Sequence, residues 1–192
     1  MKFAIVSDTH DNIINFNKAV DFLNKENISV ILHCGDICTQ ETINQAVKNF
    51  KGEIKFVRGN CDYSLDYARA PILNKIGALP STKIENFSAL VPQQMEVELG
   101  GPSSDSGQAK KIVFVHFPEV ARRLAESGKY DLVFYGHTHR PWLDRRSFSE
   151  GGEEKTCLLI NPGELAGQIF KPTFAIYDTE SDKLELKILE KI

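Results

Sequence analysis

The stretch KFAIVSDTH (residues 2–10) sets the architecture of this chain, because a short apolar run ends there in polar side chains that suit a metal ion. Such a run is typical of a buried β-strand. Apolar residues from Ile13 to Leu23 then recur at helical spacing, which predicts a helix after the strand. We therefore expect Asp8 and His10 just beyond the end of the first strand.

The same alternation continues along the chain. Apolar runs at 29–33 and 54–57 predict two further strands, and the apolar positions between 43 and 50 predict the helix that joins them. A β-α-β-α-β order implies parallel strands with right-handed crossovers. The first third of the chain is therefore predicted to form a parallel sheet with helical connections.

The pattern becomes mixed after residue 63. We expect strand material at 83–99, a polar loop at 100–109, buried strands at 112–115 and 132–135, and a helix at 120–126. The last third favours antiparallel strands at 142–148, 157–160, 173–178 and 183–189. Together these segments predict one mixed α/β domain that spans residues 1–192.

Composition narrows the classes of function. The 192 residues carry a formal net charge of −3 and no run of basic residues, so a nucleic-acid partner is not favoured, although a small phosphate ester remains open. No apolar stretch reaches the ~20 residues that a membrane span needs. The N-terminus lacks the features of a signal peptide, and the four cysteines are expected to be reduced thiols, so we expect a cytoplasmic protein. The oligomeric state stays open, and a homo-oligomer is possible.

Polar side chains follow the end of each predicted strand in the parallel part of the fold. Ligand sites in open α/β sheets lie beyond the carboxyl ends of the strands, so these side chains are expected at one edge. The set comprises Asp8, His10, Asp36, Asn60, Asp62, His116, His137 and His139. Carboxylate, amide and imidazole groups form a mixed oxygen and nitrogen set that suits Mn²⁺, Fe²⁺, Zn²⁺ or Ni²⁺.

Each of these residues has a simpler interpretation when taken alone. An aspartate after a strand is usually a turn or a helix cap, and Asp11 is expected to be such a cap. His33 lies within a strand run and is expected to be structural or to support the site. Four of the five histidines, however, fall at the one predicted edge, beside Gly35, Gly59 and Gly136. This conjunction favours a metal site, with glycines that permit close approach of the backbone.

The motifs carry a family resemblance. SDTHDN, HCGD, GNCD, YGHTHRP and INPGE occur in the order seen in calcineurin-like metallophosphoesterases, and the chain resembles their small bacterial and archaeal phosphodiesterases. The resemblance implies two packed mixed β-sheets flanked by helices, a four-layer α/β/β/α sandwich. It also implies two divalent cations, with manganese favoured. One would be held by Asp8, His10, Asp36 and His139, and the other by Asp36, Asn60, His116 and His137.

The implied reaction is hydrolysis of a phosphate ester by water that is activated between the two cations. Asp36 would bridge the cations, Asn60 would donate an amide N–H to a phosphate oxygen, and His116 would complete the catalytic set. The chain departs from the family at three places, one of which is a loop from Gly101 to Ala109 that looks longer than the family's tight turn. Phe117 follows His116 where the subgroup usually has glycine, and Cys61 stands where many members have an acid histidine.

These departures bear on substrate class. A thiol is a poor general acid at neutral pH, so Cys61 is expected to be a small packed residue, and Asp62 is expected to lack the histidine that it would orient. The departures favour a phosphodiesterase. The alternatives are a phosphomonoesterase or nucleotidase with the same metals, and an interaction scaffold on this fold. The presence of all seven candidate ligands argues against the scaffold.

Overall fold

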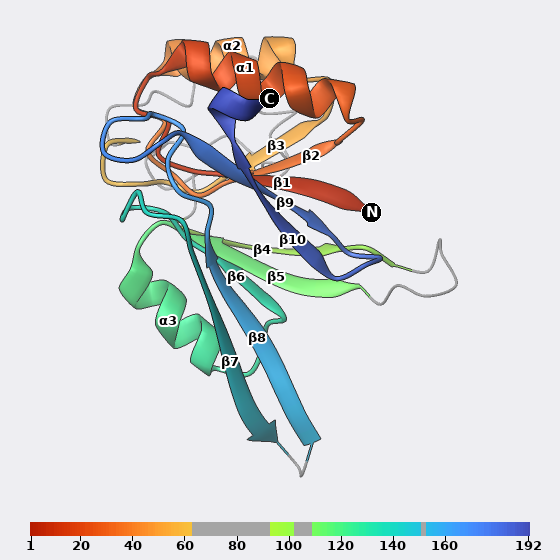
Figure 1. Ribbon diagram of the computed structural model, residues 1–192. Coiled ribbons are helices and arrows are strands. Elements are labelled where there is room, and N and C mark those ends of the chain that lie inside the picture. The colour runs from red at the N-terminus through yellow and green to blue at the C-terminus, as the bar shows by residue number, and fades with distance from the viewer. Residues whose placement is uncertain (63–92, 102–108, 151–152) are drawn as a thin grey trace, which may run out of the picture.

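The computed structural model describes residues 1–62, 93–101, 109–150 and 153–192. Its strands are β1 (Lys2–Val6), β2 (Val30–His33), β3 (Glu53–Phe56), β4 (Gln94–Leu99), β5 (Lys110–Val115), β6 (Leu132–Phe134), β7 (Trp142–Glu150), β8 (Glu153–Asn161), β9 (Thr173–Asp178) and β10 (Lys183–Ile188). The helices are α1 (Ile13–Lys25), α2 (Gln40–Asn49) and α3 (Pro118–Glu126), followed by a 3-10 turn at Leu189–Lys191 (Figure 1).

The strands form two five-stranded sheets. The first has the order β10-β9-β1-β2-β3, and the second has the order β4-β5-β6-β8-β7. The predicted parallel pairing of β1, β2 and β3 is confirmed. The expected antiparallel C-terminal third is confirmed for the β7–β8 and β9–β10 pairs, but β8 also pairs in parallel with β6. Each sheet is therefore mixed, with three parallel strands in each.

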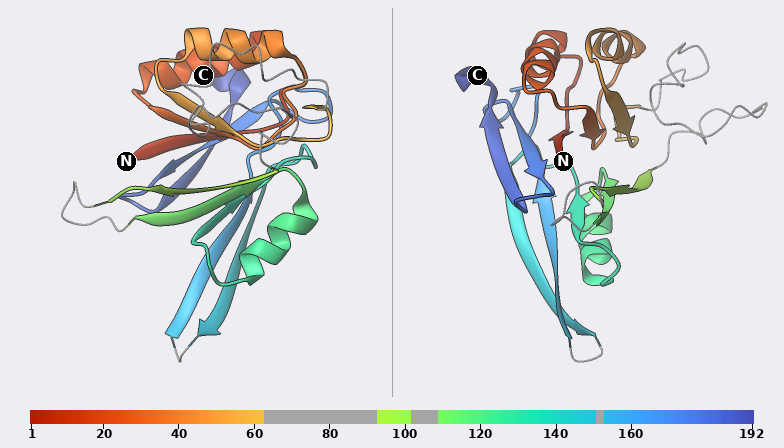
Figure 2. Two further views of the ribbon diagram at one scale, coloured as in Figure 1. Left: turned by 180° about the vertical axis from the view of Figure 1, so that it is seen from behind. Right: turned by 90° about the vertical axis from the view of Figure 1, so that its right-hand side faces the viewer.

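The sheets pack face to face between helical layers, so the expected four-layer sandwich is confirmed (Figure 2). Every residue of β1 from Phe3 to Val6 is buried because the strand faces a layer on both sides. Ala4 and Val6 pack in the cluster beneath α1 and α2, whereas Phe3 and Ile5 pack against the second sheet. A third cluster seats α3 on the outer face of that sheet. The continuous apolar run of β1 thus follows from its central position.

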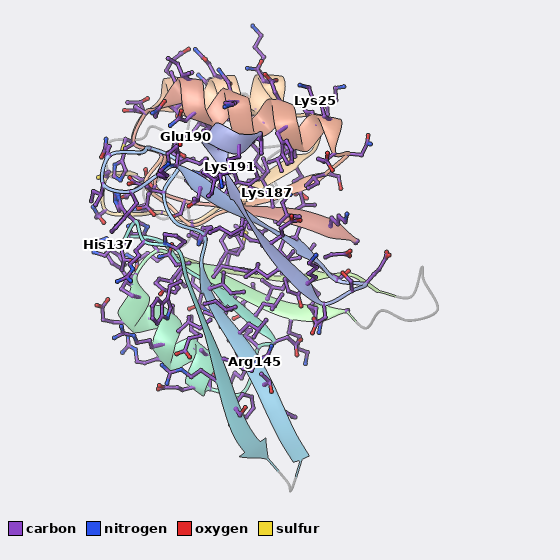
Figure 3. All side chains as sticks on the ribbon, viewed as in Figure 1. Lys25, His137, Arg145, Lys187, Glu190 and Lys191 are labelled. Carbon is purple, nitrogen blue, oxygen red and sulfur yellow. The ribbon has the colours of Figure 1, made fainter. Side chains whose placement is uncertain are left out.

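The parallel strands give the sandwich a functional edge. The loops that follow β1, β2 and β3 leave one sheet, and those that follow β5, β6 and β8 leave the other. In Figure 1 these loops gather at the end of β1 opposite the labelled N-terminus. Figure 3 shows His137 at this edge, while Arg145 lies farther down β7.

Part of the predicted strand material at 83–99 is confirmed, because β4 occupies its last six residues. Residues 63–92 and 102–108, which include the rest of that segment and most of the predicted 100–109 loop, lie outside the described residues. None of the helices in the described part of the chain is long and apolar enough to cross a membrane.

Candidate metal centre

Four predicted ligands come together around a first point. His10 Nε2 lies 3.2 Å from His139 Nε2, 3.9 Å from Asp8 Oδ1 and 3.7 Å from Asp36 Oδ2. His139 Nε2 lies 3.5 Å from the same oxygen of Asp8. Two loops of the first sheet and one loop of the second thus aim their donor atoms at a common position.

The other predicted ligands surround a neighbouring point. Asn60 Oδ1 lies 2.9 Å from His116 Nε2 and 2.8 Å from His137 Nδ1, and these two nitrogens are 3.3 Å apart. His116 Nε2 lies 3.4 Å from Asp36 Oδ2. The same Asp36 oxygen also faces His10. Asp36 therefore stands between the two groups of donor atoms.

These separations fit two cations that would share Asp36 as a ligand. Protein nitrogen and oxygen ligands lie about 2.0–2.2 Å from a bound divalent cation, so neighbouring ligand atoms lie about 3.0–3.5 Å apart. Most of the contacts within each group fall in or near this interval. The groups Asp8–His10–His139 and Asp8–Asp36–His116 each place their ligand atoms within 4.8 Å of one another. The residues present therefore fit divalent metal ions.

The electrostatics of the centre also favour cations. Asp8 and Asp36 are 0% and 1% exposed. Within the described ranges, the ion-pair partners of both carboxylates are histidines, and no lysine or arginine pairs with them. Burial raises the pKa of Asp8 above its usual range. Burial of a carboxylate is unfavourable, and a metal ion at this position would remove that cost.

Asp36 behaves differently from Asp8. Burial favours a higher pKa for Asp36, but the hydrogen bond and charge of His116 and the backbone N–H of Cys61 outweigh burial and lower the pKa of Asp36 to about 2. The pKa of His116 is raised: burial opposes the shift, and the carboxylates of Asp36 and Asp8 overcome it. Asp36 is therefore held as an anion that faces both groups of donors.

The backbone of the centre is unusual. Five of the seven predicted ligands have a positive φ, a region that L residues other than glycine rarely adopt. They are Asp8 (51°), His10 (41°), Asp36 (59°), His137 (68°) and His139 (61°). Non-glycine residues in this region cost on the order of 1–3 kcal/mol each and cluster at functional sites. The backbone of these loops is therefore strained in the conformation that directs the side chains at the centre.

Glycines allow the loops of different strands to meet. A Cβ atom at Gly59 would lie 2.0 Å from Asp36 Oδ1, and one at Gly136 would lie 2.0 Å from Ser7 Oγ and 2.7 Å from Asp8 Oδ2. Real Cβ atoms do not approach other atoms so closely. The expectation that glycines permit close backbone approach beside the ligands is therefore confirmed at these two positions.

Partners outside the cluster orient two of the histidine rings. His116 donates its Nδ1–H to the carbonyl of Cys34 at 2.8 Å, and His139 Nδ1 lies 2.8 Å from Glu164 Oε2. In each ring this turns Nε2 toward the centre. Such partners of metal-bound histidines fix the tautomer and raise ligand basicity.

Glu164 supports the candidate centre, although the sequence alone did not single it out. It is fully buried after β8, and it accepts hydrogen bonds from the backbone N–H groups of Gln168, Ile169 and Phe170 as well as from His139. Burial opposes ionisation, but these donors lower the pKa of Glu164 below its usual range. Glutamate is rarely fully buried in proteins. The one sign of its role in the sequence is its place in the INPGE motif.

The structure corrects the expectation for Cys61 and gives Asp62 backbone partners in place of a histidine. Cys61 is exposed rather than packed. Asp62 has partners, because its two oxygens accept the backbone N–H groups of Asp36, Ile37, Cys38 and Gly59 at 2.8–2.9 Å. Four donors use the accepting positions of one carboxylate. Asp62 therefore anchors the loop that carries Asp36.

The structure also places Asp11, His33 and Phe117. The cap of α1 is Asn12, not Asp11, which instead accepts hydrogen bonds from two threonine hydroxyls beside α2. His33 is buried; its Nδ1 accepts from Gly35 N–H, so its Nε2–H donates to Thr9 Oγ1 at 2.9 Å. The half-buried ring of Phe117 lies 5.0 Å from the His116 ring and 5.1 Å from the His137 ring, which places it against the centre.

Comparison with known proteins agrees with this arrangement. Residues 1–182 match the calcineurin-like phosphoesterase superfamily domain. A phosphodiesterase of Methanocaldococcus jannaschii is 31% identical over 99% of this chain and 100% of its own length. The solved structure of an archaeal phosphodiesterase is 29% identical and covers 98% of this chain and 99% of its own, with a TM-score of 0.70.

The fold also occurs in a protein of lower sequence identity. The structure of Vps29 from Entamoeba histolytica, solved in complex with Zn²⁺, covers 97% of each chain with a TM-score of 0.55. Its sequence is 16% identical to this chain, so this similarity concerns the fold alone.

Proposed function

This chain belongs to the calcineurin-like phosphoesterase superfamily, and on that premise we propose that it is a phosphodiesterase that acts with two divalent cations. The observation that carries the proposal is the pair of adjoining donor groups that share Asp36. The 31% identity to the archaeal phosphodiesterase over its full length supports the diester assignment.

We assign Asp8, His10, Asp36 and His139 to one cation, and Asp36, Asn60, His116 and His137 to the other. When bound, the cations supply an activated water and neutralise charge on the phosphate. Manganese suits this oxygen and nitrogen set, as do nickel, iron and zinc. Glu164 and the Cys34 carbonyl hold the rings of His139 and His116 in the tautomer that presents Nε2 to the centre.

Asn60 has a second role in this proposal. Its Oδ1 faces His116 and His137, so its Nδ2 points away from them and lies 3.5 Å from Cys61 Sγ. One N–H of this amide donates to Cys61 Sγ, and the other would donate to a phosphate oxygen at the rim of the centre. The half-buried ring of Phe117 borders the same side and would form a wall against the ester group.

Protonation of the leaving group favours diesters that carry a good leaving group. Burial and the charge of Asp36 raise the pKa of Cys61 above its usual range, which makes the thiol a weak general acid. The oxygens of the Asp62 carboxylate are engaged with four backbone donors. An aryl leaving group departs with little help from an acid, whereas an alkoxide needs one.

A metal-reconstitution assay tests the proposed function. Chelation should abolish hydrolysis of an aryl phosphodiester, and Mn²⁺ added in excess of the chelator should restore it. A panel of Mn²⁺, Ni²⁺, Fe²⁺ and Zn²⁺ against diesters and monoesters identifies the preferred metal and ester class. Full activity in protein that elemental analysis shows to be metal-free would contradict the proposal, and a preference for alkyl monoesters would favour the phosphatase or nucleotidase alternative.

Further expectations accompany this function. We propose a single domain over residues 1–192 that acts on small phosphate esters rather than nucleic acid. The four cysteines are free thiols, which supports a reducing compartment such as the cytoplasm. Assembly into a homo-oligomer stays a prediction.

A further inference from the structure

Two thiols lie beside the candidate metal centre and have no part in the proposed hydrolysis. Cys38 follows β2 and Cys61 follows β3. Their sulfur atoms and a ring nitrogen of His10 lie within 4.8 Å of one another. Cys38 Sγ is 3.4 Å from His10 Nδ1, on the side of the ring that faces away from Asp8 and His139. A second donor set, rich in sulfur, therefore adjoins the first through one imidazole.

The backbone holds both cysteines in place before any ligand binds. Cys38 has a φ of 81°, and its N–H donates to Asp62 Oδ1 at 2.9 Å. The N–H of Cys61 donates to Asp36 Oδ1 at 2.8 Å. A non-glycine residue keeps a positive φ only where its surroundings determine it, so the direction of the Cα–Cβ bond of Cys38 is fixed. Little reorganisation is therefore needed to bring the sulfurs onto one ion.

We propose that Cys38, Cys61 and His10 form a further metal site that takes a thiophilic cation such as Zn²⁺, Cu⁺ or Cd²⁺. Thiolates select such ions, whereas the oxygen-rich centre beside them suits Mn²⁺. A metal bound about 2.3 Å from sulfur and about 2.0–2.1 Å from nitrogen, at near-tetrahedral angles, separates a sulfur from a nitrogen by about 3.5 Å. The 3.4 Å between Cys38 Sγ and His10 Nδ1 matches this value.

The site has an open side. Cys61 is exposed and Cys38 is partly exposed, so an ion can reach the sulfurs from solvent and keep a water as a further ligand. Binding releases the thiol protons, since a coordinated thiol is deprotonated. It also takes the Nδ1 proton of His10, whose Nε2 belongs to the first donor group. Occupation by a thiophilic ion is thereby coupled to the neighbouring cation position.

Cadmium titration tests the site without any assay of hydrolysis. Cd²⁺ is added to the Mn²⁺-loaded full chain, kept reduced with a phosphine, while the ultraviolet charge-transfer absorption of cadmium–thiolate bonds is followed. Cadmium that exchanges into the oxygen and nitrogen centre gives no such band. We expect a band that saturates at about one Cd²⁺ per chain, because two thiolates on one ion form one site.

Variants locate the sulfur atoms responsible. The Cys38→Ser/Cys61→Ser double variant should lose the band, and Cys61→Ser alone, a conservative change at an exposed position, should weaken cadmium binding at least about tenfold. Cys157→Ala, which removes a thiol buried beneath α3, is the matched control and should keep the band. Absence of the band in the wild type, or its persistence in the double variant, would overturn the proposal. Neither result depends on whether the chain hydrolyses phosphodiesters.

Discussion

His139 Nδ1 lies 2.8 Å from Oε2 of Glu164, a carboxylate with no exposed surface. This contact connects the loop after β6 to the loop after β8, and it holds the ring so that Nε2 faces Asp8. Glu164 also organises its own loop through three backbone N–H groups. The ligand and the loop that supports it are therefore set by one buried carboxylate.

Glu164→Gln should weaken metal binding by about 10- to 100-fold, because an amide orients the His139 ring less firmly and raises its basicity less. Isothermal titration of the metal-free variant with Mn²⁺ measures the change. Glu26→Gln, an exposed substitution at the end of α1, is the control and should bind as the wild type does. Unchanged affinity in Glu164→Gln would show that the His139 orientation is set by other contacts.

Asp36→Asn should lower activity by roughly 100-fold or more and reduce the metal content below two ions per chain. A carboxylate that faces both donor groups neutralises charge that an amide cannot. Its replacement should therefore lower activity more than replacement of a residue that only orients a ligand. Elemental analysis and kcat/KM on an aryl diester measure the two effects. Asp21→Asn, at an exposed position of α1, controls for the change of charge. A variant with two ions and normal turnover would show that Asp36 is not the bridge.

Phe117→Gly should raise kcat/KM for diesters with bulky substituents on the order of tenfold relative to small ones, because it removes a wall beside His116 and His137. Glycine is accepted at the N-cap position that Phe117 occupies in α3, so the melting temperature should change little. Phe117→Leu should give an intermediate preference. Unchanged kinetics with a large drop in melting temperature would instead indicate that the ring is part of the core.

The wild type should hydrolyse aryl diesters far better than alkyl monoesters, since general acid catalysis is worth ~10²–10⁴-fold and Cys61 is a weak acid. Cys61→His should raise turnover of alkyl monoesters preferentially. The gain should stay below that range, because the Asp62 carboxylate is committed to four backbone donors and cannot orient the new ring.

Cys61→Ala provides the control for this comparison. It keeps the backbone N–H that donates to Asp36, so the ratio of kcat/KM for the two ester classes should stay at the wild-type value. A selective loss of diester hydrolysis in Cys61→Ala, with both metals retained, would reveal a catalytic role for the thiol.

Much of the architecture follows from the sequence, because a short run of apolar residues predicts a buried strand. β1, β2, β5 and β6 are short strands in which most residues are buried on both faces. The parallel partner of β8 could not be predicted, because a strand of nine residues that extends beyond the core looks like part of a hairpin. Pairing between distant strands leaves no local pattern.

The residues that hold the ligands of the centre in place were harder to predict than the ligands themselves. The ligand types stand out because His10 and His139 lie in motifs with two candidate donors each. Glu164 and Asp62 act through backbone N–H groups, which every residue has, so residue type gives no sign of the contact. Cys38 owes its direction to a positive φ and to the Asp62 hydrogen bond, which appear only once the loops are assembled.

The two donor groups draw their residues from both sheets. Asp8, His10, Asp36 and Asn60 belong to loops of the first sheet, whereas the three remaining histidines belong to the second. An ion held between them is a removable cross-link that exists only in the folded chain. An ion that binds only the folded chain stabilises the native state by about 2.7 kcal/mol at a concentration 100 times its dissociation constant. The resistance of this protein to heat and proteolysis should therefore rise and fall with the concentration of free divalent metal. Metal depletion would then speed its degradation as well as abolish its activity.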